Sequence, residues 1–427
     1  MKSFIPLFVV LIFFSSCKSD VSVTGVFLTQ NLVTLDIGDN LTLEALIKPN
    51  DATNKNVSWK SNKPDIVEVS NAGSVTAVSP GTAVITVTTQ DGNKTADCTV
   101  IVNKKDIVVE PPDDRTIITG YLPEYRINIS APGDLTYLSV PDRIYFFNIL
   151  PDAQGDWYLE PSILSKINIV KGAMTSGQEI FIVVGGGASA INMHIMGASA
   201  TKREEFAEAI VNFAHANNFN GIDLDWEPDW SQSPATKVPL DQFVDLMTRI
   251  RNKMNALPET TTLKKLTTAI GTQQDSRELA LAVVNIIDQI NVMLYDIYGT
   301  SSEGFPHVPM YMFKELLENF VTDGIPKDKL LGGVPFYGGN RTVSPTQNKT
   351  YQELYNNASA AGTPLTASVN SFDNFAFNGV NLIKEKTRYV IDNDFAGMMI
   401  WELGQDIPYD NYLSLLRAMK ETIVASY

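Results

Sequence analysis

A repeating pattern in residues 116–427 restricts the fold more than any other feature of the chain. Eight short runs rich in β-branched or aromatic residues recur there, and amphipathic stretches separate them. Strands that are apolar on both faces are typical of a parallel sheet covered by helices. Eight such units predict an α/β protein with a (β/α)8 TIM barrel, whose functional site lies at the carboxyl ends of the strands. The predicted strands are Ile117–Leu122, Arg143–Leu150, Glu179–Gly185, Phe219–Asp225, Leu266–Gly271, Ile290–Tyr295, Leu330–Phe336 and Phe395–Trp401.

Some of the helices between these strands can also be placed. Thr201 and Glu204 have the spacing of a capping box, which predicts a helix start,. Asp241 precedes apolar residues at helical spacing, from Phe243 to Leu257,. Between the seventh and eighth strands we expect a helix over residues 379–392, preceded by about forty irregular residues.

Residues 21–103 predict a small all-β domain. About seven β-rich runs alternate there with turn signals such as Gly38-Asp39 and Asp91-Gly92, which favours a β-sandwich. Cys98 is expected to be a small core hydrophobe. Residues 104–115 contain Glu110-Pro111-Pro112 and predict a semi-rigid linker.

The all-β segment resembles the bacterial immunoglobulin-like group 2 module. The resemblance covers the whole segment and implies a spacer, with an adhesive unit as the alternative. The residues that carry it are Trp59-x-Ser61, Gly73-x-Val75-x-Ala77, Gly81-x-Ala83-x-Ile85-Thr86 and Asp91-Gly92.

The first residues have the pattern of a targeting segment. Lys2 precedes an apolar run from Phe4 to Phe14, which Ser15-Ser16-Cys17 follows. This pattern predicts a signal peptide over residues 1–16, because the run is shorter than the roughly twenty residues that span a bilayer. The junction resembles a bacterial lipobox, which implies that Cys17 is lipidated and anchors an exported chain to a bacterial membrane. We expect this to be the outer membrane, with the chain on its periplasmic or cell-surface side. The alternative is ordinary cleavage, with no role for Cys17.

Composition excludes several classes of partner. The chain has 33 basic and 48 acidic residues, a net charge of −15, which disfavours nucleic acid. Two cysteines and three histidines are too few soft ligands for a structural zinc site, so we expect no metal and no cofactor. The histidines are expected to be surface or hydrogen-bonded polar residues.

Three acidic residues alternate at the end of the fourth predicted strand. Alternate residues of a strand share one face, at about 6.7 Å per step, so Asp223, Asp225 and Glu227 should form a row directed into the barrel. Three acids in a low-dielectric lumen cannot all ionise cheaply, so at least one pKa must rise. A carboxylic acid still protonated near neutral pH suits general acid cleavage of a glycosidic bond.

This Asp-x-Asp-x-Glu signature resembles that of glycoside hydrolase family 18, the chitinase family. The resemblance extends through the barrel, to Gly120-Tyr121, Gly185-Gly186, Met293-Leu294-Tyr295-Asp296, Leu331–Gly338 and Met399–Leu403. It implies a retaining mechanism in which the acetamido group of the substrate replaces an enzyme nucleophile, unlike the usual scheme of two carboxylates.

The resemblance also implies roles for individual residues. Glu227 would be the general acid and then the base, Asp225 would hold the acetamido group, and Asp223 would share a proton behind it. Tyr295 would donate a hydrogen bond to the acetamido carbonyl. Substrate contacts are implied for Tyr121, Phe147, Gly186, Met293, Asp296 and Trp401, with Trp401 as the floor of the subsite.

Other residues leave alternatives open. A methionine such as Met293 is more often a core residue, and Trp230 is either a sugar platform or a loop-packing residue. Val183 stands where the family often has a serine that bonds the first acid, so we expect Tyr121 to hold Asp223 alone. Arg341 stands two positions later than the family's usual arginine.

Three functions are compatible with this site. We expect an endo-acting chitinase that cleaves an oligo- or polysaccharide containing N-acetylglucosamine, because the segment between the last two strands is too short to build a deep cleft. By the family resemblance, Met-x-Tyr-Asp favours this reading over an endo-β-N-acetylglucosaminidase that releases N-glycans from glycoproteins, because relatives that cut the core of N-glycans often lack that Asp. The second alternative is a non-catalytic, lectin-like barrel, against which the presence of Glu227 argues.

Overall fold

The computed structural model describes residues 20–36, 39–79, 81–103, 116–131, 133–187, 190–231, 234–297, 307–340, 342–343 and 346–427. The predicted signal peptide, Cys17, the predicted linker and Arg341 lie outside these residues. The chain divides into two compact units, Met1–Pro111 and Pro112–Tyr427. No helix within the described ranges is both long and apolar enough to cross a membrane.

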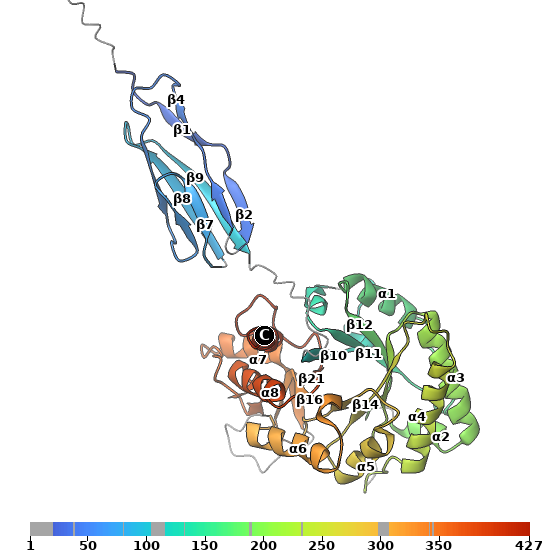
Figure 1. Ribbon diagram of the computed structural model, residues 1–427. Helices are drawn as coiled ribbons and strands as arrows, with labels where there is room; N and C mark the ends of the chain where they lie inside the picture. The colour runs from blue at the N-terminus through green and yellow to red at the C-terminus, as the bar shows by residue number, and fades with distance from the viewer. Residues whose placement is uncertain are drawn as a thin grey trace, which may run out of the picture. The chain divides into compact units, whose positions relative to one another are not determined.

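The described residues of the first unit form strands and no helix (Figure 1). One sheet has the strand order β2-β9-β8-β5 and a second has the order β3-β7-β6. The buried faces of both sheets contribute to one core, in which Cys98 is fully buried as expected. The strands are β2 (Leu32–Asp36), β3 (Asn40–Thr42), β5 (Val57–Ser61), β6 (Val67–Val69), β7 (Ser74–Ala77), β8 (Gly81–Thr89) and β9 (Thr95–Asn103).

Two further strands of this unit were not anticipated from the sequence. β1 (Gly25–Leu28) and β4 (Ala45–Lys48) form an antiparallel ribbon of their own. Phe27 and Leu46 face each other across it, and both side chains are exposed. An apolar pair on an exposed face gives no clear inside-outside alternation, which is the signal that identifies a half-buried strand.

The second unit is a closed barrel of eight parallel strands, as the sequence predicted. Helices surround the barrel (Figure 1). In closing order the strands are β10 (Ile117–Pro123), β11 (Arg143–Ile149), β12 (Glu179–Gly185), β13 (Gly221–Asp225), β14 (Lys265–Ile270), β15 (Gln289–Val292), β16 (Leu330–Pro335) and β21 (Gly397–Trp401).

The strands are buried on both faces because side chains alternate between two cores. Outward-facing residues such as Ile118, Ile144 and Leu224 pack against the helices. Inward-facing residues such as Tyr145, Phe181 and Met399 fill the lumen. This alternation also directs the acids of β13 inward, since Asp223 and Asp225 alternate with Leu224,.

The helices follow the predicted β/α order. They are α1 (Ile163–Ala173), α2 (Ala190–Gly197), α3 (Ala200–Ala216), α4 (Leu240–Asn255), α5 (Gln274–Val283), α6 (Met310–Thr322), α7 (Tyr351–Ala360), α8 (Val380–Asp392) and α9 (Leu415–Val424).

The predicted capping box at Thr201 is wrong. Helix α3 begins at Ala200, and its N-cap is Ser199, whose side chain accepts a hydrogen bond from the Lys202 backbone N–H at 3.3 Å. Ser199 has extended backbone angles, which an N-cap requires, whereas Thr201 already lies within the helix.

The segment between β16 and β21 is also more ordered than expected. A four-stranded antiparallel sheet of order β18-β17-β20-β19 forms there, with α7 beside it in the sequence. The strands of this sheet are only two to four residues long, so they lack the periodicity that would identify them. They are β17 (Tyr337–Asn340), β18 (Gln347–Thr350), β19 (Ser371–Phe372) and β20 (Phe375–Ala376).

Candidate active site

Asp223 is the most enclosed of the three acids. Its carboxylate is fully buried and accepts hydrogen bonds from Tyr121 Oη at 2.7 Å, Thr267 Oγ1 at 2.5 Å and Asn291 Nδ2 at 3.2 Å. Burial raises the pKa of Asp223 to about 6, although these hydrogen bonds act in the opposite direction. Because donors from three strands converge on it, Asp223 is held in one orientation.

The expectation that Tyr121 holds Asp223 alone is therefore wrong. In the barrel register Val183 of β12 and Thr267 of β14 flank Asp223 on its two sides. Val183 offers no donor, and the hydroxyl comes from the opposite neighbour instead. Asn291 adds an amide from β15. It interrupts an apolar run as a lone polar residue, and this was the one signal in the sequence that could have identified it.

Asp225 ends strand β13 and is almost fully buried. Burial raises its pKa well above the ordinary range for an aspartate, and the charges of Glu227 and Asp223 add to this effect. No residue within the described ranges donates a hydrogen bond to its Oδ1 atom. A buried carboxyl oxygen without a donor is costly, which makes Asp225 ready to bind a polar group of a ligand.

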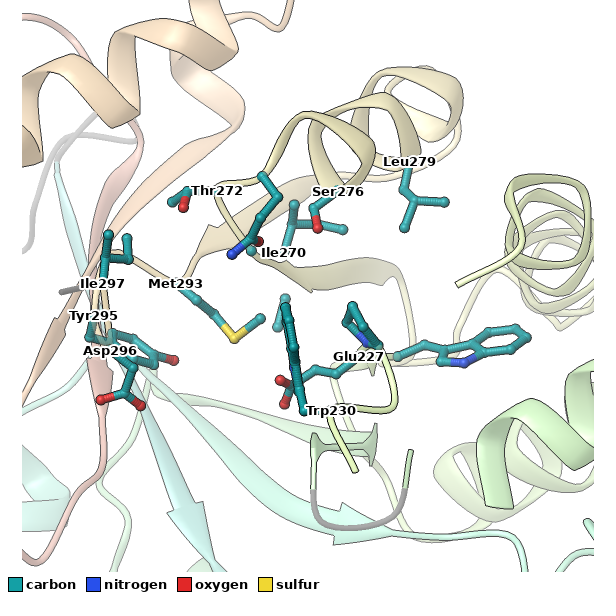
Figure 2. A pocket seen from close by; sticks show the side chains of 15 residues that line it. Glu227, Trp230, Ile270, Thr272, Ser276, Leu279, Met293, Tyr295, Asp296 and Ile297 are labelled. Atoms are coloured by element: carbon teal, nitrogen blue, oxygen red, sulfur yellow. The ribbon is translucent and has the colours of Figure 1, made fainter. Parts of the chain in front are cut away.

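Glu227 lines a cavity of about 460 Å³ at the carboxyl ends of β13, β14 and β15 (Figure 2). Burial raises the pKa of its carboxyl group and the charge of Asp296 adds to this, whereas a hydrogen bond from the Gly187 backbone N–H lowers it. The carboxyl group thus combines access to a cavity with a bias toward its protonated form. These are the properties of a general acid.

Tyr295, Met293 and Asp296 line the same cavity (Figure 2). The Tyr295 hydroxyl lies 4.0 Å from Met399 Sδ, and burial together with the nearby acids raises its pKa well above the ordinary value. Met293 is half-buried at the wall. Asp296 is 51% exposed and accepts a hydrogen bond of 2.7 Å from the Tyr337 hydroxyl.

The remaining predicted substrate contacts form an aromatic cluster inside the barrel. Trp401 packs edge-to-face on Phe147 with ring centroids 5.0 Å apart, and it lies 5.7 Å from Tyr121. Tyr121 is only 1% exposed, so its role in this structure is to bond Asp223. Gly186 has φ +111°, and a Cβ atom there would lie 2.4 Å from Phe147 Cζ. None of these four residues lines the cavity described above.

The structure also places Trp230, whose role the sequence left open, and adds two residues that the sequence did not indicate. Trp230 is 58% exposed and lines the cavity near Glu227 (Figure 2). Tyr337 and His307 both contact Asp296, and neither was predicted to do so. In the part of the chain that the structure describes, no group of three or more His, Cys, Asp or Glu side chains could hold a metal ion.

These features define a (β/α)8 barrel with a row of buried acids at the carboxyl end of its fourth strand. Residues 143–406 match the family described as Glycosyl hydrolases family 18. The chain belongs to this family. Residues 22–100 match the Bacterial Ig-like domain (group 2), in agreement with the all-β unit.

Several curated proteins are similar to parts of the chain. Chitinase A1 of Niallia circulans is 28% identical over 311 residues, which cover 59% of this chain and 44% of that protein. A class V chitinase of Arabidopsis thaliana is 20% identical over 286 residues, covering 58% and 74% of the two chains. The chain thus spans less than half the length of Chitinase A1.

Solved structures support the fold. The GH18 chitinase ChiB from the chitin utilization locus of Flavobacterium johnsoniae has a TM-score of 0.60 and 24% identity, covering 74% of this chain and 96% of that one. A chitinase from Bacteroides thetaiotaomicron has a TM-score of 0.58 and 21% identity, covering 72% and 96%. At such identities the likeness shows the fold alone.

Proposed function

We propose that the barrel hydrolyses β-1,4 linkages between N-acetylglucosamine units, as a chitinase-like enzyme. The observation that carries this proposal is the position of Glu227, a carboxyl group with a raised pKa at the wall of a cavity and two residues beyond the buried Asp225. The similarity to chitinases supports the choice of amino sugar.

The proposed reaction retains the anomeric configuration. Glu227 donates its proton to the glycosidic oxygen while the acetamido oxygen of the substrate attacks the anomeric carbon, so the bond to the leaving sugar breaks and a cyclic oxazolinium ion forms. Glu227, now a carboxylate, removes a proton from water, which attacks the anomeric carbon and reopens the ring. The proton taken from water restores the acid form of Glu227, and no covalent bond to the enzyme forms.

The neighbouring residues support this sequence of steps. Asp225, with an oxygen that lacks a donor among the described residues, binds the acetamido N–H and stabilises the positive charge of the ring. Asp223 is held by three hydrogen-bond donors and lies behind Asp225, where it shares a proton with that residue. Tyr295 donates to the acetamido oxygen from the cavity wall.

The direct test compares the full chain with Glu227→Gln on chitin oligomers and on a glycoprotein that carries N-glycans. We expect hydrolysis of the oligomers by the wild type and a loss of at least about a thousandfold in Glu227→Gln, because the general acid is absent. Glu315→Gln, an exposed position on α6, is the matched control and should match the wild type.

Each other outcome has a definite meaning. Hydrolysis that survives in Glu227→Gln would remove Glu227 from the mechanism. Release of N-glycans with intact oligomers would establish the endo-β-N-acetylglucosaminidase activity instead. Binding of oligomers without turnover by the wild type would leave the lectin-like function. Proton NMR of the first product distinguishes retention, which gives the β-anomer, from inversion.

We also propose that the enzyme cleaves within the polymer and is anchored at Cys17. Endo cleavage predicts a fast fall in the viscosity of a soluble chitin derivative before many reducing ends appear. Anchoring predicts that the wild type sediments with membranes and that Cys17→Ser does not. The all-β unit would then be a spacer, and its deletion should leave hydrolysis of soluble oligomers unchanged.

A further inference from the structure

Asp296 has a backbone conformation that an aspartate rarely adopts. Its φ is +54°, in the left-handed region that side chains with a Cβ atom seldom occupy. Such a conformation persists only where the surroundings hold it. Asp296 directly follows Tyr295, and both line the cavity that contains Glu227 (Figure 2).

His307 holds the backbone of Asp296. The Asp296 N–H donates to His307 Nε2 at 2.9 Å, and the same nitrogen lies 3.4 Å from Asp296 Oδ1. In this geometry Nε2 is the acceptor of the hydrogen bond from the Asp296 backbone N–H,. The side chain is fully buried, so water does not compete for this contact.

Tyr337 holds the carboxylate of the same residue. Its hydroxyl donates to Asp296 Oδ1 at 2.7 Å, and its ring packs edge-to-face on the His307 imidazole with centroids 5.2 Å apart. His307 and Tyr337 therefore fix the backbone and the side chain of Asp296 as a pair.

His307 is itself fixed from the side away from the cavity. Its backbone N–H donates to the Phe377 carbonyl at 3.3 Å, and its carbonyl accepts from Lys386 Nζ at 3.5 Å. Lys386 is buried on α8 and also donates to Asn378 Oδ1 at 3.0 Å. The support for Asp296 thus reaches from α8 through His307 to the cavity wall.

We propose that His307 is a positioning residue, which locks Asp296 in its left-handed conformation and so sets the negative charge that faces Glu227. This inference rests on the proposed function of Glu227 as the general acid. Among the described residues, the charged and titratable groups that interact with the Glu227 carboxyl are Asp225, Asp296 and Tyr295. The His194 side chain bonds the Glu227 backbone. Among the described residues, His307 is not one of those that line the cavity, so it acts on Glu227 through Asp296.

The consequence for pH dependence has a definite sign. The Asp296 charge favours the protonated form of Glu227 and raises its pKa. If Asp296 loses its fixed conformation, its carboxylate moves into water and this effect weakens. The pKa of Glu227 then falls, and the alkaline limb of the activity profile moves to lower pH.

The test compares three variants of the full chain. His307→Phe keeps a ring of similar size against Tyr337 and removes the acceptor, whereas His307→Gln retains an acceptor at a similar distance from the backbone. His215→Phe is the matched control. His215 lies on α3, its Nδ1 atom is hydrogen-bonded to Thr261 Oγ1 at 2.9 Å, and it does not line the cavity. Calorimetry of each variant establishes that it is folded.

Two measurements are made. The first is the pH profile of kcat and KM on a chitin oligomer. For His307→Phe we expect a fall in kcat of about tenfold or more, as misplaced catalytic groups cause, a smaller change in KM, and an alkaline limb shifted downward. His307→Gln should restore most of kcat and the wild-type profile, and His215→Phe should match the wild type.

The second measurement is independent of turnover. Carbon-13 NMR of protein labelled at the glutamate carboxyl groups, with Glu227→Gln for assignment, gives the Glu227 pKa directly. A lower pKa in His307→Phe than in the wild type supports the proposal even if chitin is not the substrate. A folded His307→Phe variant with an unchanged Glu227 pKa and an unchanged kcat would overturn it.

A second variant keeps the proposal testable if His307→Phe does not fold. Tyr337→Phe removes the donor to Asp296 Oδ1 and keeps the ring. We expect it to lower the Glu227 pKa in the same direction and by less than Asp296→Asn, which removes the charge itself. An unchanged Glu227 pKa in Asp296→Asn would remove the basis of the proposal.

Discussion

The Tyr121 hydroxyl donates a hydrogen bond of 2.7 Å to Asp223, across 102 positions of the sequence. Barrel closure brings the first strand and the fourth strand to a common lumen, where Thr267 and Asn291 join the same carboxylate. The first acid of the row is therefore controlled by strands on both sides of it.

Removal of one donor should make Asp223 a weaker acid. Tyr121→Phe and Thr267→Val each delete a hydrogen bond to the charged form, so each should raise the pKa of Asp223 above its value of about 6,. Carbon-13 NMR titration of aspartate carboxyl groups measures the shift. Tyr351→Phe, a buried tyrosine bonded to the Leu413 carbonyl, is the control, and an equal shift there would contradict the assignment.

Asp225→Asn should stabilise the barrel while it impairs catalysis. The raised pKa means that the ionised carboxylate destabilises the folded state. The cost is absent below the unfolded pKa, near 4, and grows as the pH rises toward the folded pKa. We expect a gain of about 1 kcal/mol or more at pH 8 and none at pH 3, measured by denaturant unfolding. A gain that does not depend on pH would point to packing instead.

Gly186→Ala should destabilise the barrel by about 2 kcal/mol or more. Its φ of +111° is strained for alanine, and the added Cβ would lie 2.4 Å from Phe147 Cζ. Gly172→Ala in α1 has no atom within 4 Å of the new Cβ, and it should stabilise the protein by about 0.5–1 kcal/mol. Urea unfolding of the two variants checks the contrast, and similar effects at both sites would refute the argument.

Lys386 should make the stability of the barrel rise with pH. Burial lowers the pKa of Lys386 to about 7 in the folded state. Between pH 7 and the ordinary pKa of lysine, the unfolded chain therefore binds more protons than the folded chain, and the free energy of unfolding rises with pH. Lys386→Met should show a smaller rise between pH 7 and about 9.5 in urea unfolding. Lys384→Met, exposed on the same helix, should keep the wild-type slope.

The variant Trp230→Ala tests whether the Trp230 ring binds a sugar or packs within its own loop. The ring is 58% exposed at the cavity wall, so a platform predicts about tenfold weaker binding of long oligomers, since a large aromatic contact contributes about 1.4 kcal/mol or more. Binding is measured by calorimetry on the Glu227→Gln background. Tyr311→Ala, 60% exposed on α6, is the control. Loop packing predicts a loss of thermal stability and unchanged binding.

Local patterns were sufficient for the architecture. The eight strands, the helix at Val380–Asp392 and the inward direction of Asp223 and Asp225 follow from the periodicity of side chains along one segment,. The failures were also local. β1 and β4 also carry apolar residues on their exposed face, such as Phe27 and Leu46, which obscures the alternation. The strands of the segment before β21 are too short, and Ser199, which caps α3, lies two positions before Thr201.

The sequence by itself determined that this chain contains a barrel with a row of acids at one strand end, because a strand's two faces are encoded by alternate residues. Only the tertiary structure decided which groups surround those acids. Thr267 reaches Asp223 through the register of neighbouring strands, and His307 reaches Asp296 across eleven positions with no shared periodicity. Contacts of this kind depend on barrel closure and loop paths, which no single segment of sequence specifies.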